Sequence, residues 1–165
     1  MKFIVSSTGL FSHLQAVSRV INSKNSLPIL DCFLFELTDG TLNITASDSE
    51  TTLSTSIEVN EYEGEGRFAV SSKTLLDALK EIPEQPLSFD LNQESLEICI
   101  QYLNGKYNLI GQNADEYPLT PSLGTNAVTV DAEASVVLSG INRSLFATAD
   151  DELRPVMNGI YFDIT

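Results

Sequence analysis

An internal repeat constrains this chain more than any other feature of its sequence. The segment Phe3-Ile4-Val5-Ser6-Ser7 returns in constant register as Phe68-Ala69-Val70-Ser71-Ser72, and Leu10 then matches Leu75. A third, weaker copy begins at Val128. Self-similarity of this kind indicates that one structural unit is used more than once along the chain.

Each copy changes its hydrophobic period in the same way. Alternating apolar residues, typical of a strand, are followed by a Ser-Ser or Asp-Ala-Glu start and then by apolar residues at helical spacing. Asp39-Gly40 separates the strand-like runs 32–37 and 41–46, and Asn104-Gly105 separates 96–103 from 106–110; both dipeptides are typical of hairpin turns. The predicted order is β-α-β-β-β twice and then β-α-β, which is an α+β fold.

This order predicts one complete domain and the beginning of another. We expect residues 1–124 to form a domain from two half-repeats, at about 1–64 and 65–124, and the proline-containing stretch 115–124 to be a linker. Residues 125–165 then begin a second domain. A lone β-α-β unit cannot bury both of its faces, so we expect the natural chain to continue beyond Thr165.

The distribution of charge matters more than its total. The formal net charge of −14 argues, when taken alone, against a nucleic-acid partner. The predicted helices nevertheless carry basic residues opposite their apolar faces, and the first, expected over 8–24, contains no acidic residue. These residues are Arg19, Lys73, Lys80 and Arg143, with Lys24 just after the first apolar stripe. They are either ordinary solvated helix faces or, if the repeated helices share one side, a surface that contacts phosphates.

Cysteine usage and hydropathy predict a cytoplasmic protein. Cys32 and Cys99 lie in strand-like runs without a Cys-x-x-Cys pair, so we expect two reduced structural thiols. No apolar run approaches the ~20 residues that a membrane-spanning helix requires. The N-terminus lacks the long apolar segment and cleavage site of a signal peptide.

An enzyme is the main alternative class, and the sequence offers little for it. The single histidine, His13, flanks an apolar helical stripe, and the Gly-x-Ser-x-Gly, GxxxxGK[ST] and GxGxxG motifs are absent. The acidic turns 48–50 and 150–152 lack the spacing of a calcium loop. We therefore expect no metal and no cofactor. A protein-interaction module of repeated α+β units that never meets DNA is a further alternative.

Several motifs, taken in order, resemble those of a known family. Leu27-Pro28-Ile29-Leu30, Asp39-Gly40-Thr41-Leu42, Tyr107-Asn108-Leu109, Asp115-Glu116-Tyr117-Pro118 and Arg154-Pro155-Val156-Met157-Asn158-Gly159 look like segments of the bacterial sliding clamp family. This family comprises the beta subunits of the replicative DNA polymerase III. The resemblance runs from Met1 to Thr165 and rests on the order and spacing of the motifs, since none is decisive alone.

The resemblance implies a non-catalytic DNA clamp. Such a clamp has three domains per chain and closes as a homodimer ring, with helices lining the inner face and antiparallel sheets outside. The ring encircles duplex DNA without reading bases and tethers the polymerase, and a clamp loader places it on DNA. Loose phosphate contacts suit this role because base-specific contacts would stop sliding.

Some positions acquire roles from the resemblance alone. Lys24 occupies the family's basic loop after the first helix, and Lys73 matches a basic position at the start of the second. Tyr107 and Leu109 fall on the edge strand that pairs with the partner subunit, and Met157 matches an apolar position in the pocket for partner peptides.

The chain also departs from the family's pattern near Met157. The loop 150–152 is Asp-Asp-Glu, where the family can offer an amide to DNA, and Pro155-Val156 stands where an aromatic pair is expected. An acidic loop repels phosphate, so the resemblance does not extend to DNA contact by this loop.

Overall fold

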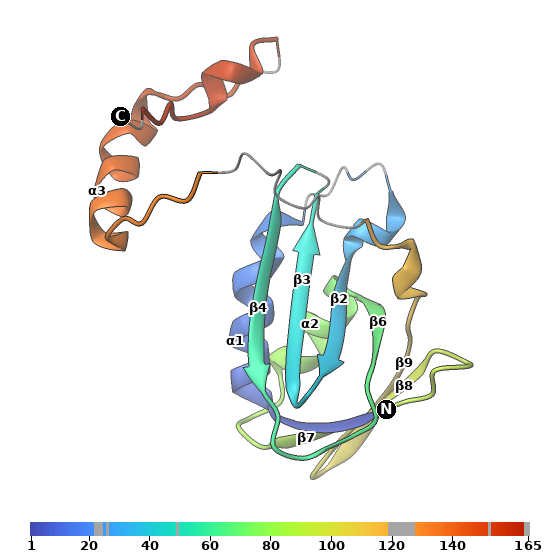
Figure 1. Ribbon diagram of the computed structural model, residues 1–165. Coiled ribbons are helices and arrows are strands. Elements are labelled where there is room, and N and C mark those ends of the chain that lie inside the picture. The colour runs from blue at the N-terminus through green and yellow to red at the C-terminus, as the bar shows by residue number, and fades with distance from the viewer. Residues whose placement is uncertain (22–24, 26, 49, 119–127, 152, 164–165) are drawn as a thin grey trace. The chain divides into compact units, whose positions relative to one another are not determined.

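The computed structural model describes residues 1–21, 25, 27–48, 50–118, 128–151 and 153–163. The chain divides into two compact units, Met1–Pro121 (unit 1) and Ser122–Thr165 (unit 2). All of the strands in the described residues belong to unit 1, whereas unit 2 contains the helix α3 (Figure 1).

Unit 1 contains nine strands and two α-helices within its described residues. In chain order these are β1 (Lys2–Ser6), α1 (Ser7–Val17), β2 (Cys32–Thr38), β3 (Thr41–Ser47), β4 (Thr52–Glu58), β5 (Tyr62–Glu63), β6 (Gly66–Ser71), α2 (Ser72–Lys80), β7 (Pro86–Leu91), β8 (Glu97–Tyr102) and β9 (Gly105–Ile110). Apart from the short β5, this is the predicted β-α-β-β-β order used twice, and the α+β fold is confirmed.

The two halves of unit 1 exchange their first strands. One sheet has the order β5-β1-β7-β8-β9 and the other has the order β4-β3-β2-β6. The antiparallel pair β1–β7 therefore joins the first half to the second, and so does the equivalent pair β6–β2. Each sheet combines three consecutive strands of one half with the opening strand of the other, and the five-stranded sheet also includes the short β5 of the first half, so the halves are interlocked.

One hydrophobic core takes side chains from both sheets and both helices. At its centre the repeat appears as two equivalent ring pairs: Phe3 stacks on Phe89 at 4.8 Å between centroids, and Phe68 stacks on Phe35 at 5.0 Å. All four rings are buried. Stacked aromatic pairs contribute roughly 0.5–1.5 kcal/mol beyond the apolar area that they bury. Each pair joins one half of unit 1 to the other.

The repeated Ser-Ser segments begin the two helices, as predicted. The Ser6 hydroxyl oxygen accepts a hydrogen bond from the Gly9 backbone N–H at 3.0 Å and caps α1. Ser71 caps α2 in the same way, accepting from the Thr74 N–H at 3.4 Å. These bonds satisfy N–H groups that the first turn of a helix leaves without a partner.

The two predicted hairpins form with different turns. Asp39 and Gly40 link β2 to β3 with φ of 47° and 73°, as a two-residue hairpin with both central residues at positive φ requires. The β8–β9 hairpin also forms, but Tyr102 pairs with Gly105, so its loop is Leu103-Asn104 rather than the expected Asn104-Gly105. A side chain on Gly105 would meet the Tyr102 hydroxyl at 2.7 Å, which explains why glycine suits this paired position.

The first helix is shorter than predicted. It ends at Val17 and is followed by a 3₁₀ turn, Ser18–Val20, so the expected helix over 8–24 was wrong for residues 18–21, while residues 22–24 lie outside the described part of the chain. Val20 is buried and Ile21 packs against the core. The apolar spacing therefore continued past the point where the backbone left the α conformation, and the periodicity could not mark the helix end.

Unit 2 corrects the prediction for the third copy. Its helix α3 (Ala134–Ser144) is present, but the described residues 128–130 and 159–163, where strands were expected, are not in strands. A strand needs a neighbour for its backbone N–H and C=O groups. The described part of unit 2 contains no strand that would serve as one.

No helix among the described residues is long and apolar enough to cross a membrane.

Candidate nucleic-acid interface and sheet edge

The helices α1 and α2 contact each other on one face of the four-stranded sheet (Figure 1). α1 packs on β3 and β4, and α2 packs on β2 and β6. Their apolar stripes are buried in the core, which leaves a polar outer face on each helix. On α1 the exposed residues are Thr8, Ser12, Gln15 and Ala16, and on α2 they are Lys73, Thr74, Asp77 and Lys80.

Three of the predicted DNA-facing residues lie exposed on or beside this helix pair. Lys73 and Lys80 stand on α2, whereas Arg19 lies in the 3₁₀ turn just after α1 and not in the helix itself. Lys24 lies outside the described residues. Asp77 and Glu81 are exposed close by, so the outer face of α2 carries both signs of charge.

Ion pairing divides the described basic residues into two groups, and the predicted DNA-facing ones fall in the unpaired group together with Lys106. Three ion pairs are present in the described part of the chain: Lys2 with Asp90 at 3.2 Å, Arg154 with Asp151 at 2.8 Å, and Arg67 with Asp115. Arg19, Lys73, Lys80, Lys106 and Arg143 form none with any described carboxylate. An exposed cation without a carboxylate partner is available to an incoming phosphate.

Glu84 is a charged residue of this region that the sequence analysis missed. Its carboxylate accepts hydrogen bonds from the hydroxyls of Ser6, at 2.9 Å, and Thr8, at the start of α1. A negative charge is favourable at a helix N-terminus, where it also occupies a position that would suit a phosphate. The contact between Ser6 and Glu84 spans 78 residues of sequence and depends on the interlocked halves, so no local sequence motif predicts it.

His13 has a structural partner. Its Nδ1 lies 2.6 Å from the Thr55 hydroxyl oxygen, which ties α1 to β4. No group of three or more His, Cys, Asp or Glu side chains within the described ranges is placed to hold a metal ion.

Two buried ionisable groups, Cys32 at the start of β2 and Tyr117, belong to a second, smaller hydrophobic cluster and have a structural role. The Tyr117 hydroxyl donates to the Cys32 carbonyl oxygen at 3.4 Å. Burial, reinforced by the negative charge of Asp31, raises the pKa of the Cys32 thiol to about 11, and burial raises the pKa of Tyr117 to about 12. Both groups are therefore neutral near pH 7, and Cys32 is not the thiolate that a nucleophilic cysteine requires. Cys32 and Cys99 are both free thiols.

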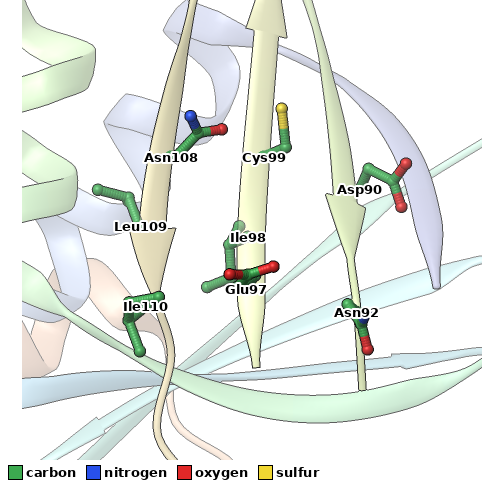
Figure 2. A pocket seen from close by; sticks show the side chains of 8 residues that line it. All are labelled: Asp90, Asn92, Glu97, Ile98, Cys99, Asn108, Leu109 and Ile110. Carbon is green, nitrogen blue, oxygen red and sulfur yellow. The ribbon is translucent and has the colours of Figure 1, made fainter. Parts of the chain in front are cut away.

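Tyr107 and Leu109 lie on β9, which is an edge of the five-stranded sheet. Leu109 packs against the core, and Tyr107 stacks on Tyr102 with 5.8 Å between ring centroids. Figure 2 shows the hollow beside this edge, where Asp90, Cys99 and Asn108 stand on three neighbouring strands. The open strand and this hollow together form a surface that another extended segment would fit.

The remaining predicted site residues belong to unit 2. Arg143 is exposed in the last turn of α3. Met157 is 49% exposed, and its carbonyl oxygen accepts from the Ala149 N–H at 2.9 Å. In the acidic loop, Asp151 is held by Arg154 and Asp150 is exposed, while residue 152 lies outside the described part.

Comparison with known proteins agrees with this architecture. Residues 1–121 match the family model described as DNA polymerase III beta subunit, N-terminal domain. The chain belongs to this family. Two curated relatives are the beta sliding clamps of Halalkalibacterium halodurans, which is 26% identical to this chain, and of Synechococcus elongatus, which is 27% identical. Each match covers 99% of this chain and 44% of the relative.

Solved structures of the same family share the fold. The DNA polymerase III subunit beta of Pseudomonas aeruginosa superimposes with a TM-score of 0.87 at 22% identity, over 96% of this chain and 43% of that one. The beta subunit from Streptococcus pyogenes gives 0.85 at 20% identity, over 94% of this chain and 42% of that one. The chain spans less than half the length of the relatives that it matches.

Proposed function

We propose that this chain is the part of a ring-shaped sliding clamp that corresponds to the clamp's first domain and the opening of its second. The ring surrounds duplex DNA and tethers a replicative DNA polymerase, so that processivity comes from topology and not from tight binding. It performs no catalysis. The observation that carries the proposal is the family match over residues 1–121, the segment that includes both interlocked halves.

The proposal assigns the outer face of the helix pair to the inner wall of the ring. Arg19, Lys73 and Lys80 contact phosphates there, together with Lys24, and Arg143 does so from the second domain. Exposed cations without carboxylate partners support this assignment for the four described residues. Long, solvated side chains suit loose contacts with the DNA backbone, which carry no sequence information.

The same proposal assigns partners to the remaining surfaces. A homodimer closes the ring, with β9 and its residues Tyr107 and Leu109 receiving a strand of the partner subunit. Met157 belongs to a pocket for peptides of the polymerase and the clamp loader. Residues 1–124 act as one domain of two half-repeats, 125–165 belong to the next, and the protein works in the cytoplasm.

A comparison of circular and linear DNA tests the topological part of the proposal. The full-length protein is loaded by its clamp loader onto nicked circular DNA, and the amount retained is measured before and after one cut of the circle. A clamp stays on the circle and slides off the linear form.

The two other possible retention patterns would each indicate a different function. Equal retention on both forms would indicate ordinary surface binding and would contradict the clamp. No retention on either form would instead favour the protein-interaction module that does not bind DNA.

A further inference from the structure

Two hollows in the surface of unit 1 meet at Ile4 and Pro86. In the β1–β7 ladder, Ile4 pairs with Ser88 and Ser6 pairs with Pro86, so Ile4 and Pro86 are diagonal neighbours on the side of the sheet that faces away from the core. Both residues are exposed, and both line each of the two hollows. One extended ligand that crosses Ile4 and Pro86 can therefore occupy both hollows at once.

The larger hollow, which we name the acidic groove, lies between α1, β1 and the end of β4. Its volume is about 440 Å³, within the range of roughly 300–1,000 Å³ that is usual for ligand clefts. Part of its lining is apolar, from Ile4, Ile57 and Pro86. Its other notable members are three exposed carboxylates, those of Glu58, Glu61 and Glu84.

The smaller hollow, which we name the apolar notch, lies on the outer face of the five-stranded sheet. Its volume is about 290 Å³, and it is lined by Ile4, Pro86, Ser88, Gln101, Tyr102 and Leu103. No charged residue is among these six. Leu103 is 80% exposed at the tip of the β8–β9 hairpin, so its side chain is available to cover an apolar group that enters the notch.

Both hollows are held in shape by contacts within unit 1. The carboxylate of Glu84 is fixed by the hydroxyls of Ser6 and Thr8. The Leu103 N–H donates to the side-chain oxygen of the buried Gln85 at 2.9 Å, which fixes the hairpin tip. A surface that is already ordered loses less conformational entropy when a ligand binds to it.

The charge of the acidic groove selects the ligand. No Lys or Arg is among the described residues that line it, and none of its carboxylates forms an ion pair with a described cation. His13 also lines the groove, and its Nδ1 is held by the Thr55 hydroxyl. The N-terminus of α1 partly balances the charge of Glu84, which leaves Glu58 and Glu61 to attract a cation.

The net charge of the chain points to a different protein as the source of that cation. The formal net charge is −14, with nine Lys and Arg against 23 Asp and Glu, so a second copy of the chain would be repelled. Nucleic acid would be repelled by the carboxylates of the groove in the same way. A segment that is both basic and apolar is complementary to the two hollows together.

We propose that the acidic groove and the apolar notch form one docking site for an extended, basic segment of another protein. An aliphatic side chain of that segment enters the notch, and a lysine or arginine side chain enters the groove with its stem across Ile4. The notch reaches from β1 to β8, which is about 10 Å, so about three residues of extended chain separate the two side chains. The inference goes beyond the proposed function, which assigns no role to either hollow.

A peptide titration tests the docking site. The probe is acetyl-Leu-Ser-Ser-Arg-amide, and the protein is the isotope-labelled 165-residue chain at low ionic strength. NMR should show saturable shifts of the backbone amide signals of residues around the two hollows, with a Kd on the order of 1 mM, as befits so short a peptide. Peptides with glutamate in place of arginine, or serine in place of leucine, should bind about fivefold more weakly or worse.

Matched substitutions test each hollow of the protein. Glu58→Gln combined with Glu61→Gln should weaken binding about fivefold, because the cation loses its partners. Glu94→Gln is the control, since Glu94 is exposed and lines neither hollow. Leu103→Ser should weaken binding by a similar factor, and its control is Ile110→Ser, at an exposed apolar residue outside both hollows. Circular dichroism checks that each variant is folded.

Three results would overturn the proposal. The first is the absence of saturable shifts up to about 10 mM peptide. The second is binding that is unchanged when the peptide carries glutamate, or that the control variants weaken equally. The third is self-association of the chain without peptide that Leu103→Ser abolishes, because a second copy would then cover the notch. Each of these results leaves the clamp proposal standing, since the comparison of circular and linear DNA decides that question separately.

Discussion

Ser7 shows how a single residue joins the two halves of unit 1. Its hydroxyl is buried, donates to the Pro83 carbonyl oxygen at 2.8 Å and accepts from the Gln85 N–H at 3.0 Å. We expect Ser7→Ala to lower the free energy of unfolding by about 1–3 kcal/mol, because it leaves a buried N–H without a partner. Urea unfolding followed by circular dichroism measures the change.

Ser12 provides the control for that substitution. It is exposed on the same helix and donates to the Gly9 carbonyl oxygen at 2.8 Å. Ser12→Ala should change stability by no more than about 0.5 kcal/mol, as is usual for surface positions. Equal effects of the two substitutions would show that the buried contact with 83–85 contributes nothing specific.

Cys32 makes stability depend on pH in the alkaline range. Its pKa is raised by burial from 9.0 to about 11, so the folded protein retains a proton that the unfolded chain releases. Stability from this group is therefore fully present below pH 9 and is lost as the pH rises through 11, by an amount on the order of 2 kcal/mol. Cys32→Ala should flatten the slope of unfolding free energy against pH in this window. If the slope is unchanged, the loss of stability at alkaline pH comes from other titrating groups.

At the scale of elements, the outer face of α2 offers the sharpest test of DNA contact. Lys73→Ala combined with Lys80→Ala should reduce the slope of log affinity against log salt by about 2, because two phosphate contacts are lost. Fluorescence anisotropy of a short labelled duplex at low ionic strength measures the affinity of the chain.

Lys2 is the matched control for the α2 lysines. It is paired with Asp90 on β7 of the five-stranded sheet, so Lys2→Ala should leave the salt slope unchanged. If Lys2→Ala lowers the slope as much per charge as the α2 variant, the contact is not specific to the helix face.

Elements were predictable from the sequence where the signal is local. Alternation, helical spacing and the Ser-Ser caps act within a few residues, so β1, α1, β6 and α2 could be placed. The end of α1 could not, because Val20 continues the apolar spacing in a 3₁₀ turn. The strands expected in unit 2 failed for a different reason, since a strand exists only with a partner that local pattern does not supply.

The candidate site likewise contains features that the local sequence pattern predicts and features that depend on long-range strand pairing. The cations of α2 follow from a helical wheel, because the opposite face of the helix is apolar. Glu84 reaches Ser6 and Thr8 only through the β1–β7 pairing, which is a property of the whole unit. The backbone directions along β9 likewise depend on a register that places Tyr102 opposite Gly105, one residue away from the turn expected from Asn104-Gly105.

At the scale of the molecule, the exchanged strands make the complete unit 1 the smallest part that can fold. Residues 1–64 contain β1 and β2 but lack β7 and β6, the strands with which each pairs across the halves. They would also lose both stacked phenylalanine pairs. A sheet deprived of a paired strand exposes apolar side chains and unsatisfied backbone groups together.

We therefore expect residues 1–64 and 65–121 to be unfolded when prepared separately and to regain structure when mixed in equal amounts. Residues 1–121, in contrast, should fold and unfold in one transition. Far-UV circular dichroism and the dispersion of amide proton signals distinguish these states. If 1–64 alone gave a dispersed spectrum as a monomer, the strand exchange would not be what holds the unit together. If structure appears only when the two fragments are mixed, each half must supply the strand that the other lacks. The repeat is then a unit of sequence and not a unit that folds independently.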